Sequence, residues 1–393
     1  MAGSDKRRYR RTSTLIAHSG RDPFAHHGFV NPPVYRASTV LFKTVESFEK
    51  RDQRYTYARR GTPTSEALEE AIARLEGGVR TWLAPSGAAA IATVLLSFTK
   101  AGDHILMVDT VYNPTRKMCD GILERFGVET TYYDPSIGGD IARLMKPNTT
   151  LVYCESPGSL TFEIQDIPAI AAAAHEKGAV VVMDNTWASP LYFKPFAHGV
   201  DISIQAATKY IGGHADAMLG AITANERLAS TVVAQAGALG ICAGTEEMYL
   251  GLRGFRTIEV RLERHWRSSV EIAGWLEQRP EVARVIHPAL PSHPQHALWK
   301  RDFLGASGLF AIELKPCAKK AVAAMLEGLE LFGMGASWGG FESLAIHYNA
   351  APGRTATAWK PEGPMVRIHI GLEDVADLRA DLEAGFERLR AAG

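Results

Sequence analysis

The chain has 393 residues, of which 46% are hydrophobic and 22% are charged, as is usual for a globular protein with more than one domain. Its 43 basic and 43 acidic residues balance to a formal net charge of zero. No global electrostatic field therefore favours nucleic acid or an anionic membrane, and we expect neither as a partner.

The four cysteines lie far apart in the sequence and form no CxxC pair. Their spacing predicts neither a metal site nor a disulfide framework, so we expect free thiols in a protein of the reducing cytoplasm. The basic residues Lys6, Arg7, Arg8, Arg10 and Arg11 are followed by no apolar segment, which argues against a secretory signal. No apolar run reaches the roughly 18 residues that a membrane span needs.

Residues 1–62 are polar, irregular and rich in arginine, proline and tyrosine. Such a segment cannot bury a core of its own, so we predict an arm that lies against a neighbouring subunit, with a disordered tail as the alternative. Tyr57 and Arg59 lie near the end of this arm. An aromatic ring beside a guanidinium group suits the binding of an anion.

Three elements are predicted after the arm: a helix over 64–76 capped by Ser65, a strand over 79–83 and a helix over 88–98. The turn Ala84-Pro85-Ser86-Gly87 joins the last two. A strand, a glycine turn and a helix N-terminus together favour anion binding, because free backbone N–H groups and the helix dipole face the ligand. Gly87 and Ala88 are therefore candidate phosphate-binding residues, although an ordinary strand–helix turn has the same pattern.

Strands and helices then alternate, with strands predicted at 104–108, 129–133, 150–154 and 179–183 and helices at 115–126 and 167–176. This alternation predicts an α/β fold with a mostly parallel sheet covered by helices. Ligands bind such sheets beyond the carboxyl ends of the strands. Tyr112, Asp184 and the pair Thr208-Lys209 all fall at such ends.

Asp184 ends one buried strand, and Lys209 follows the next strand, over 201–205. A carboxylate and a lysine at neighbouring strand ends are typical of pyridoxal 5′-phosphate (PLP) enzymes. There the lysine forms a Schiff base with the cofactor and the acid keeps the pyridine nitrogen protonated. Taken singly, the lysine could be a solvated charge and the aspartate a turn former. No GxGxxG follows the early strands, which argues against a nicotinamide enzyme.

The rest of the chain predicts a helical segment over 221–254, a long helix over 257–278 and then a small α+β domain, with the boundary near residue 256. Strands are predicted at 282–287, 308–314 and 365–370, and helices at 319–328 and 374–389. In the last strand, Arg367 lies on the face opposite Val366 and Ile368. Arg367 is thus either a clamp for a substrate carboxylate or a solvent-facing side chain. Tyr112 and Trp338 could stack on a cofactor ring or simply pack.

Several stretches together resemble the Cys/Met-metabolism PLP enzymes, a family that includes the cystathionine β- and γ-lyases. They are Ala-Ala-Thr-Lys-Tyr-Ile-Gly-Gly-His at 206–214 and the segments 55–64, 183–187, 249–254 and 367–374, within a resemblance over about residues 14–390. The resemblance implies an aspartate aminotransferase-like fold of type I. It would have an arm over 1–62, a PLP-binding domain over 63–256 with a seven-stranded, mostly parallel sheet, and an α+β domain over 257–393.

Within that family, residues 155–163, 203–209 and 337–344 look most like bacterial cystathionine β-lyases. This implies the α,β-elimination of L-cystathionine to L-homocysteine, pyruvate and ammonia in methionine biosynthesis. The alternatives are an L-cysteine desulfhydrase, a cystathionine γ-lyase, a methionine γ-lyase or a non-catalytic regulatory protein that kept the fold. Family members are commonly tetramers, so a dimer of dimers is expected.

The resemblance also implies a role for each candidate site residue. Lys209 would hold PLP and move the α-proton, Asp184 would pair with the pyridine nitrogen, and Tyr112 would stack on the ring. The phosphate would be bound by Gly87, Ala88 and Thr208 and reached from the neighbouring subunit by Tyr57 and Arg59. The substrate carboxylate would be held by Arg367, Ser337, Trp338 and Asn185. Tyr112 and Tyr57 are further catalytic candidates. Two residues depart from the family pattern: Ala206, which cannot offer a hydroxyl to the phosphate, and Ala215.

Overall fold

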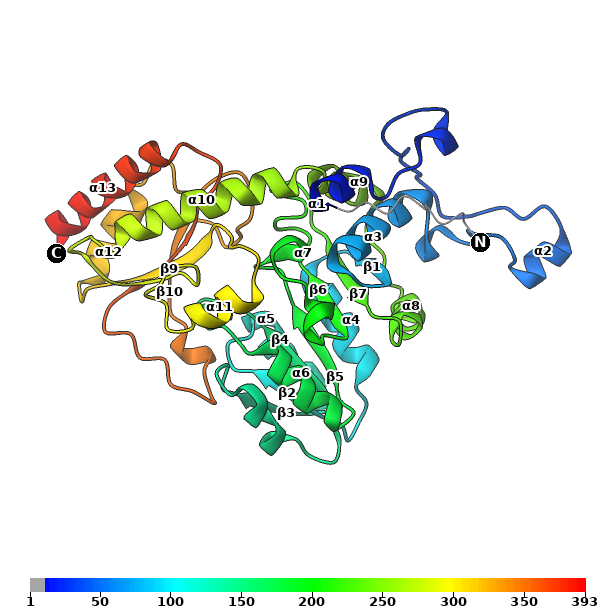
Figure 1. Ribbon diagram of the computed structural model, residues 1–393, viewed down its shortest axis with the longest axis horizontal. Coiled ribbons are helices and arrows are strands. Elements are labelled where there is room, and N and C mark those ends of the chain that lie inside the picture. The colour runs from blue at the N-terminus through cyan, green and yellow to red at the C-terminus, as the bar shows by residue number, and fades with distance from the viewer. Residues whose placement is uncertain (1–10) are drawn as a thin grey trace.

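A computed structural model describes residues 11–393 of the chain, which form a large and a small domain preceded by an extended arm (Figure 1). Lys6, Arg7, Arg8 and Arg10, on which the expectation of no secretory signal partly rests, lie outside the described residues. Among residues 11–393, no helix is both long and apolar enough to cross a membrane.

A seven-stranded sheet forms the centre of the large domain, in the order β1-β7-β6-β5-β4-β2-β3. Its strands are β1 Arg80–Ala84, β2 His104–Val108, β3 Glu129–Tyr133, β4 Thr149–Glu155, β5 Val180–Asp184, β6 Ile202–Gln205 and β7 Gly220–Ala224. Only β7 runs antiparallel to its neighbours, so the predicted mostly parallel α/β sheet is confirmed. The prediction that 221–254 is helical throughout is wrong at β7, because the short run Gly-Ala-Ile-Thr-Ala pairs between β1 and β6.

Helices pack around this sheet (Figure 1). They are α3 Pro63–Glu76, α4 Gly87–Phe98, α5 Asn113–Met118, α6 Ile167–Glu176, α7 Ser189–Tyr192, α8 Ala229–Ala238 and α9 Thr245–Phe255. The cap of α3 is Thr62 rather than the predicted Ser65, which instead returns the second hydrogen bond of a capping box. The helix predicted over 115–126 is present but begins earlier, at Asn113, and its α5 segment passes into a π-helical turn at Cys119–Leu123 before the helix ends at Arg125.

The small domain has an antiparallel four-stranded sheet in the order β10-β11-β9-β8. Its elements are β8 Val282–Ile286, β9 Leu309–Leu314, β10 Leu344–Tyr348, β11 Met365–His369, α11 His296–Asp302, α12 Lys319–Glu327 and α13 Val375–Ala392. β10 and α11 are not predicted from the sequence, because each is a short run between irregular segments. β11 is paired on both sides.

The long helix α10, Ile258–Leu276, runs from the large domain to the small one across the top of Figure 1. Its first half packs Ile258 and Leu262 into the core of the large domain, and its second half packs Ile272 and Leu276 into the core of the small domain. Because one helix contributes to both cores, the division at residue 256 and the two domain ranges stay predictions.

The described part of the arm carries two short helices, α1 Thr12–His18 and α2 Val45–Lys50, and the segment around α2 reaches away from the rest of the chain (Figure 1). Large apolar side chains of the arm are exposed, with Phe24 at 92% and Leu41 at 84% of their full accessibility. Such exposure is costly in water, so it is consistent with the predicted contact with another subunit.

Candidate active site

Lys209 lies in the turn that follows β6, at the carboxyl edge of the large sheet. Its backbone N–H donates to Ala206 O at 2.9 Å, and Gly213 N–H donates to Lys209 O at 2.7 Å. The Nζ atom donates a hydrogen bond of 2.7 Å to Ser337 Oγ and lies 5.3 Å from the centroid of the Trp338 ring. The amine of the large domain therefore meets a loop of the small domain.

Burial lowers the pKa of Lys209 to about 8, and the positive charge of Arg367 acts in the same direction. The carboxylate of Asp184 opposes both effects. A lysine with this pKa has about a tenth of its amine neutral at pH 7, far more than a solvated lysine. The amine is therefore prepared for nucleophilic attack on a carbonyl carbon.

Asp184 is the last residue of β5, and one edge of its carboxylate is held in place. Thr186 donates to Oδ1 through its backbone N–H at 3.0 Å and its hydroxyl at 2.5 Å. The same hydroxyl accepts the Ala206 N–H at 2.9 Å, which ties the end of β5 to the turn before Lys209. Within residues 11–393 no hydrogen bond reaches Oδ2, so this oxygen is available to a cationic nitrogen.

Burial raises the pKa of Asp184, and the hydrogen bonds from Thr186 and the charge of Lys209 oppose this shift. An isolated carboxylate in this position is thus costly to ionise. A protonated ring nitrogen beside Oδ2 would supply the missing positive charge.

The helix α4 begins at the same edge of the sheet, and Ser86 caps it by accepting the Ala89 N–H at 3.1 Å. The N–H groups of Gly87 and Ala88, in the first turn, have no partner within the helix. A Cβ atom at Gly87 would lie only 2.6 Å from Ala206 Cβ, so the two backbones approach too closely for any other residue. Ala206 therefore lies against the N-terminus of α4 and forms one side of the candidate phosphate-binding site.

Thr208 lies beside this candidate phosphate-binding site, but its hydroxyl already forms hydrogen bonds with the Leu219 backbone. Its Oγ1 donates to Leu219 O at 3.1 Å and accepts the Leu219 N–H at 2.9 Å. The phosphate contact of Thr208 stays a prediction, and it requires the hydroxyl to exchange its partner.

Arg367 forms the wall opposite the sheet edge, on β11. It is 8% exposed, and its Nη2 donates to Gly335 O at 3.1 Å and Ser337 O at 2.9 Å. Burial lowers the pKa of Arg367, and the nearby phenol groups of Tyr348 and Tyr112 oppose this shift. The alternative of a solvent-facing arginine is wrong, because the β11 face that carries Arg367 is buried under the loop before β10.

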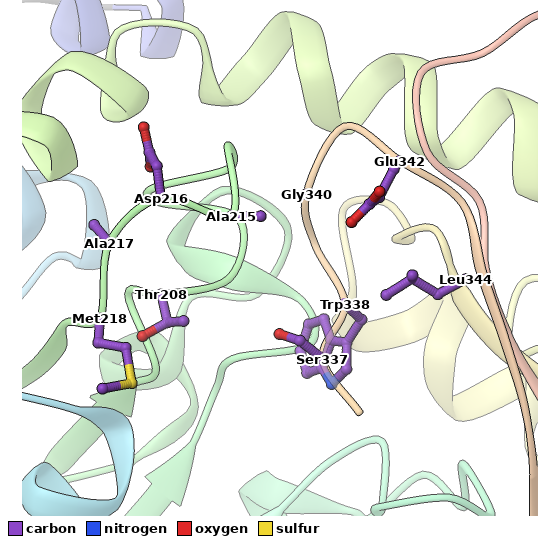
Figure 2. Close-up of a pocket in the computed structure, with 10 residues that line it drawn as sticks. All are labelled: Thr208, Ala215, Asp216, Ala217, Met218, Ser337, Trp338, Gly340, Glu342 and Leu344. Atoms are coloured by element: carbon purple, nitrogen blue, oxygen red, sulfur yellow. The ribbon is translucent and has the colours of Figure 1, made fainter. Parts of the chain in front are cut away.

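A cavity of about 290 Å³ opens between the two domains beside Lys209. Figure 2 shows Thr208 on one side of it and Ser337 and Trp338 on the other. Gly339, with φ at +86°, brings the loop so close that an added Cβ would lie 3.0 Å from Lys209 Cβ. Ala215 also lines the cavity, and its φ of 56° is a left-handed conformation that costs an alanine on the order of 1 kcal/mol.

Tyr112 lies between β2 and α5 and is half-exposed at this site. Its backbone N–H donates to Glu155 Oε2 at 2.8 Å. Burial and the nearby carboxyl groups of Glu155 and Asp184 raise the pKa of Tyr112. The phenol therefore keeps its proton at neutral pH and can act as a hydrogen-bond donor.

Three predicted site residues do not lie with the others. Tyr57 and Arg59 line a separate cavity of about 310 Å³ with Trp82, and the Arg59 guanidinium donates to Gly237 O. The Asn185 side chain is fully buried, with Nδ2 3.3 Å from both Ser189 O and Phe193 O. In this conformation the amide of Asn185 cannot contact a substrate.

Sequence reasoning missed the side-chain roles of Thr186, Glu155 and the Ser337 hydroxyl. Thr186 and Glu155 each lie directly at the carboxyl end of a predicted strand, in Asp184-Asn185-Thr186 and in Cys154-Glu155. That position could have identified them. The contact between Lys209 and Ser337 joins residues 128 apart in sequence, so no local pattern predicts it.

These residues fit PLP on structural grounds. Lys209 has a lowered pKa, and Asp184 has a carboxylate oxygen that accepts no hydrogen bond within the described residues. At the N-terminus of α4, the close approach of Ala206 leaves room only for glycine at position 87. Lys209, Asp184 and the Gly87-Ala88 turn would hold it. In the described part of the chain, no group of three or more His, Cys, Asp or Glu side chains is arranged to hold a metal ion.

Comparisons with known proteins agree with this fit. Residues 13–387 match a family described as Cys/Met metabolism PLP-dependent enzyme. A Rhizobium johnstonii protein, provisionally named a cystathionine beta-lyase, is 55% identical over 378 residues, 95% of each chain. The Escherichia coli protein named Cystathionine beta-lyase MetC is 43% identical over 97% of this chain and 99% of its own. The crystal structure of a cystathionine gamma synthase from Xanthomonas oryzae superposes with a TM-score of 0.90 and 32% identity, over 97% of this chain and 99% of that one.

Proposed function

The chain belongs to the Cys/Met metabolism PLP-dependent enzyme family, and we propose that it is a carbon–sulfur lyase that cleaves L-cystathionine by α,β-elimination. The overall reaction consumes one water and yields L-homocysteine, pyruvate and ammonia. The observation that carries the proposal is the meeting of Lys209, Asp184 and the Ser337-Trp338 loop at one sheet edge. Identities of 43–55% to proteins named as cystathionine β-lyases support this substrate over others in the family.

The chemistry that bound PLP supplies is an electron-accepting ring next to the substrate Cα. Asp184 Oδ2 stabilises a proton on the ring nitrogen, and Thr186 keeps that carboxylate oriented. Because the charge of Asp184 is buried, this ion pair is stronger than it would be in water.

Lys209 Nζ takes the proton from the substrate Cα, after which the bond from Cβ to sulfur breaks and the thiolate of homocysteine leaves. The lowered pKa suits this role, since a base acts best when its pKa lies near the working pH. Ser337 Oγ orients the amine before the reaction.

Arg367 holds the substrate α-carboxylate by exchanging its bonds to Gly335 O and Ser337 O for a bidentate pair with the substrate. The backbone of Ser337 and Trp338 completes that site. The proposal gives Asn185 no substrate contact while its amide is buried as it is here.

Tyr57 and Arg59 serve the site of a second copy of the chain, in a dimer that pairs further into a tetramer. Two observations support this: they line a cavity of their own, and the arm that carries them exposes large apolar side chains. An arginine supplied by the second copy would complete the charge around the phosphate at Gly87 and Ala88.

The proposal is tested by incubating the purified holoenzyme with L-cystathionine and identifying the products. We expect homocysteine and pyruvate in equal amounts. Cleavage to cysteine and 2-oxobutyrate would instead identify a γ-lyase. The absence of any thiol would leave the fold without the proposed activity.

A further inference from the structure

A second carboxyl group, that of Glu155, lies at the same sheet edge, accepts the Tyr112 N–H and takes no part in the proposed reaction. Glu155 ends β4, and its Cα is the register partner of the Asp184 Cα on the neighbouring parallel strand β5. Side chains at matched positions of parallel strands point to the same face, so the two carboxyl groups lie side by side.

The surroundings of the two acids differ. Asp184 receives two hydrogen bonds from Thr186 and the favourable charge of Lys209. Glu155 receives one, from the Tyr112 backbone, and within residues 11–393 it forms no ion pair with a lysine, arginine or histidine. Of two adjacent acids, the one with fewer donors and no cation keeps its proton.

The titratable groups that face Glu155 reinforce this difference. They are Asp184 on β5, Tyr112 before α5 and Tyr153 on β4 itself, whose buried hydroxyl is coupled to both acids and has no hydrogen-bond partner in the described chain. Burial and the charge of Asp184 raise the pKa of Glu155 well above its usual value. None of these groups supplies positive charge to Glu155.

We propose that Glu155 is a positioning residue that stays a neutral carboxylic acid, holds the Tyr112 backbone N–H and leaves the negative charge at these strand ends to Asp184. From the proposed function, the inference takes only that Asp184 faces the ring nitrogen of bound PLP. A second negative charge beside Asp184 would raise the pKa of Asp184 as well, and the pair would then share one proton. The hydrogen bond from the Tyr112 backbone N–H to Glu155 holds Tyr112 in place at the start of α5.

The test compares the variants Glu155→Gln, Glu155→Ala and Glu155→Asp. Glutamine matches a neutral glutamic acid in shape and can still accept the Tyr112 N–H. Alanine removes the acceptor, and aspartate is one methylene too short to reach it. The apo form of each is titrated with PLP between pH 6 and 9, the dissociation constant being followed by absorbance. Glu176→Gln, at the exposed end of α6, serves as the control.

We expect Glu155→Gln and Glu176→Gln to bind PLP within about twofold of the parent chain with the same pH profile, and Glu155→Ala and Glu155→Asp to bind about tenfold more weakly. A Gln variant as weak as the Ala variant, or one with a shifted pH profile, would show that Glu155 acts as an anion and overturn the proposal. So would Ala and Asp variants that bind normally. The PLP affinity of Glu155→Gln tests the proposal even if Glu155→Ala does not fold. Since no substrate is present, the outcome is independent of which carbon–sulfur bond the enzyme breaks.

Discussion

Lys209 shows how a single side chain acquires its reactivity from its surroundings. Its amine is removed from water at the end of β6 and lies near the charge of Arg367, and both effects lower its pKa. The hydrogen bond to Ser337 Oγ and the ring of Trp338 then set its direction. The acid–base state and the orientation of the amine thus come from different domains.

The pKa of Lys209 predicts the pH dependence of cofactor capture. Only the neutral amine attacks an aldehyde, so the rate at which the apoenzyme takes up PLP should rise about tenfold per pH unit below pH 8 and level off above it. Stopped-flow absorbance at a series of pH values measures this rate. A rate that keeps rising up to pH 10 would mean that the amine titrates like a solvated lysine.

For single residues, the sequence predicts which residues belong to the site better than it predicts what their side chains contact. Lys209 and Asp184 are found as chemically distinctive residues at strand ends. Asn185 is placed in the site by its position beside Asp184, yet its side chain points into the core and contacts Ser189 O and Phe193 O. The direction of a side chain after a strand depends on the turn, which a single sequence does not reveal.

At the scale of elements, the end of α3 is joined to the strands of the site by a buried carboxyl group. Glu76 Oε1 accepts hydrogen bonds from Ser203 Oγ at 3.0 Å and Gln205 Nε2 at 2.8 Å, both on β6. Its other oxygen and Asn185 Oδ1 are both buried without partners in the described chain. Burial raises the pKa of Glu76 to about 7, and the hydrogen bonds from Gln205 and Ser203 and the charge of Lys194 only partly oppose this shift.

Glu76→Gln should therefore stabilise the protein at alkaline pH. The pKa of Glu76 is higher in the folded state than its ordinary 4.5, so its contribution to stability is present at low pH and is lost as pH rises to about 7. The variant should match the parent chain near pH 4.5 and exceed it above pH 7 by up to the order of 3 kcal/mol, at about 1.4 kcal/mol per pKa unit. Urea unfolding at both pH values measures the difference. A variant that is less stable at pH 8 would indicate an ionised Glu76.

The elements themselves are predictable where the hydrophobic pattern is long or bounded by turns. β2, β3 and α6 begin and end at the predicted residues. β7 is mistaken for helix, because five small and apolar residues satisfy either periodicity and only the pairing with β1 and β6 decides between them.

At the scale of the whole molecule, one chain does not complete the proposed site. The cavity that Tyr57 and Arg59 line lies apart from the cavity beside Lys209. The arm projects from the rest of the chain (Figure 1). No periodicity in one sequence reports a contact between two copies, so this part of the site rests on the family resemblance and on the exposed arm.

The two-copy site predicts complementation between inactive variants. Lys209→Ala and Arg59→Ala should each be nearly inactive, but a mixed dimer has one site with both residues intact. Co-expression should restore up to about a quarter of the parent activity, as random pairing of two chains gives. Differently tagged chains show whether mixed dimers form. Mixed dimers without activity would place Lys209 and Arg59 in the same chain's site.

Lys209, among all lysines of the chain, is the residue that we propose holds the cofactor. Reduction of the holoenzyme with borohydride fixes bound PLP to the amine that carries it, and peptide mass spectrometry then locates the label. We expect one pyridoxyl group per chain, on the peptide that contains Lys209. A label on any other lysine, or none on Lys209, would contradict it.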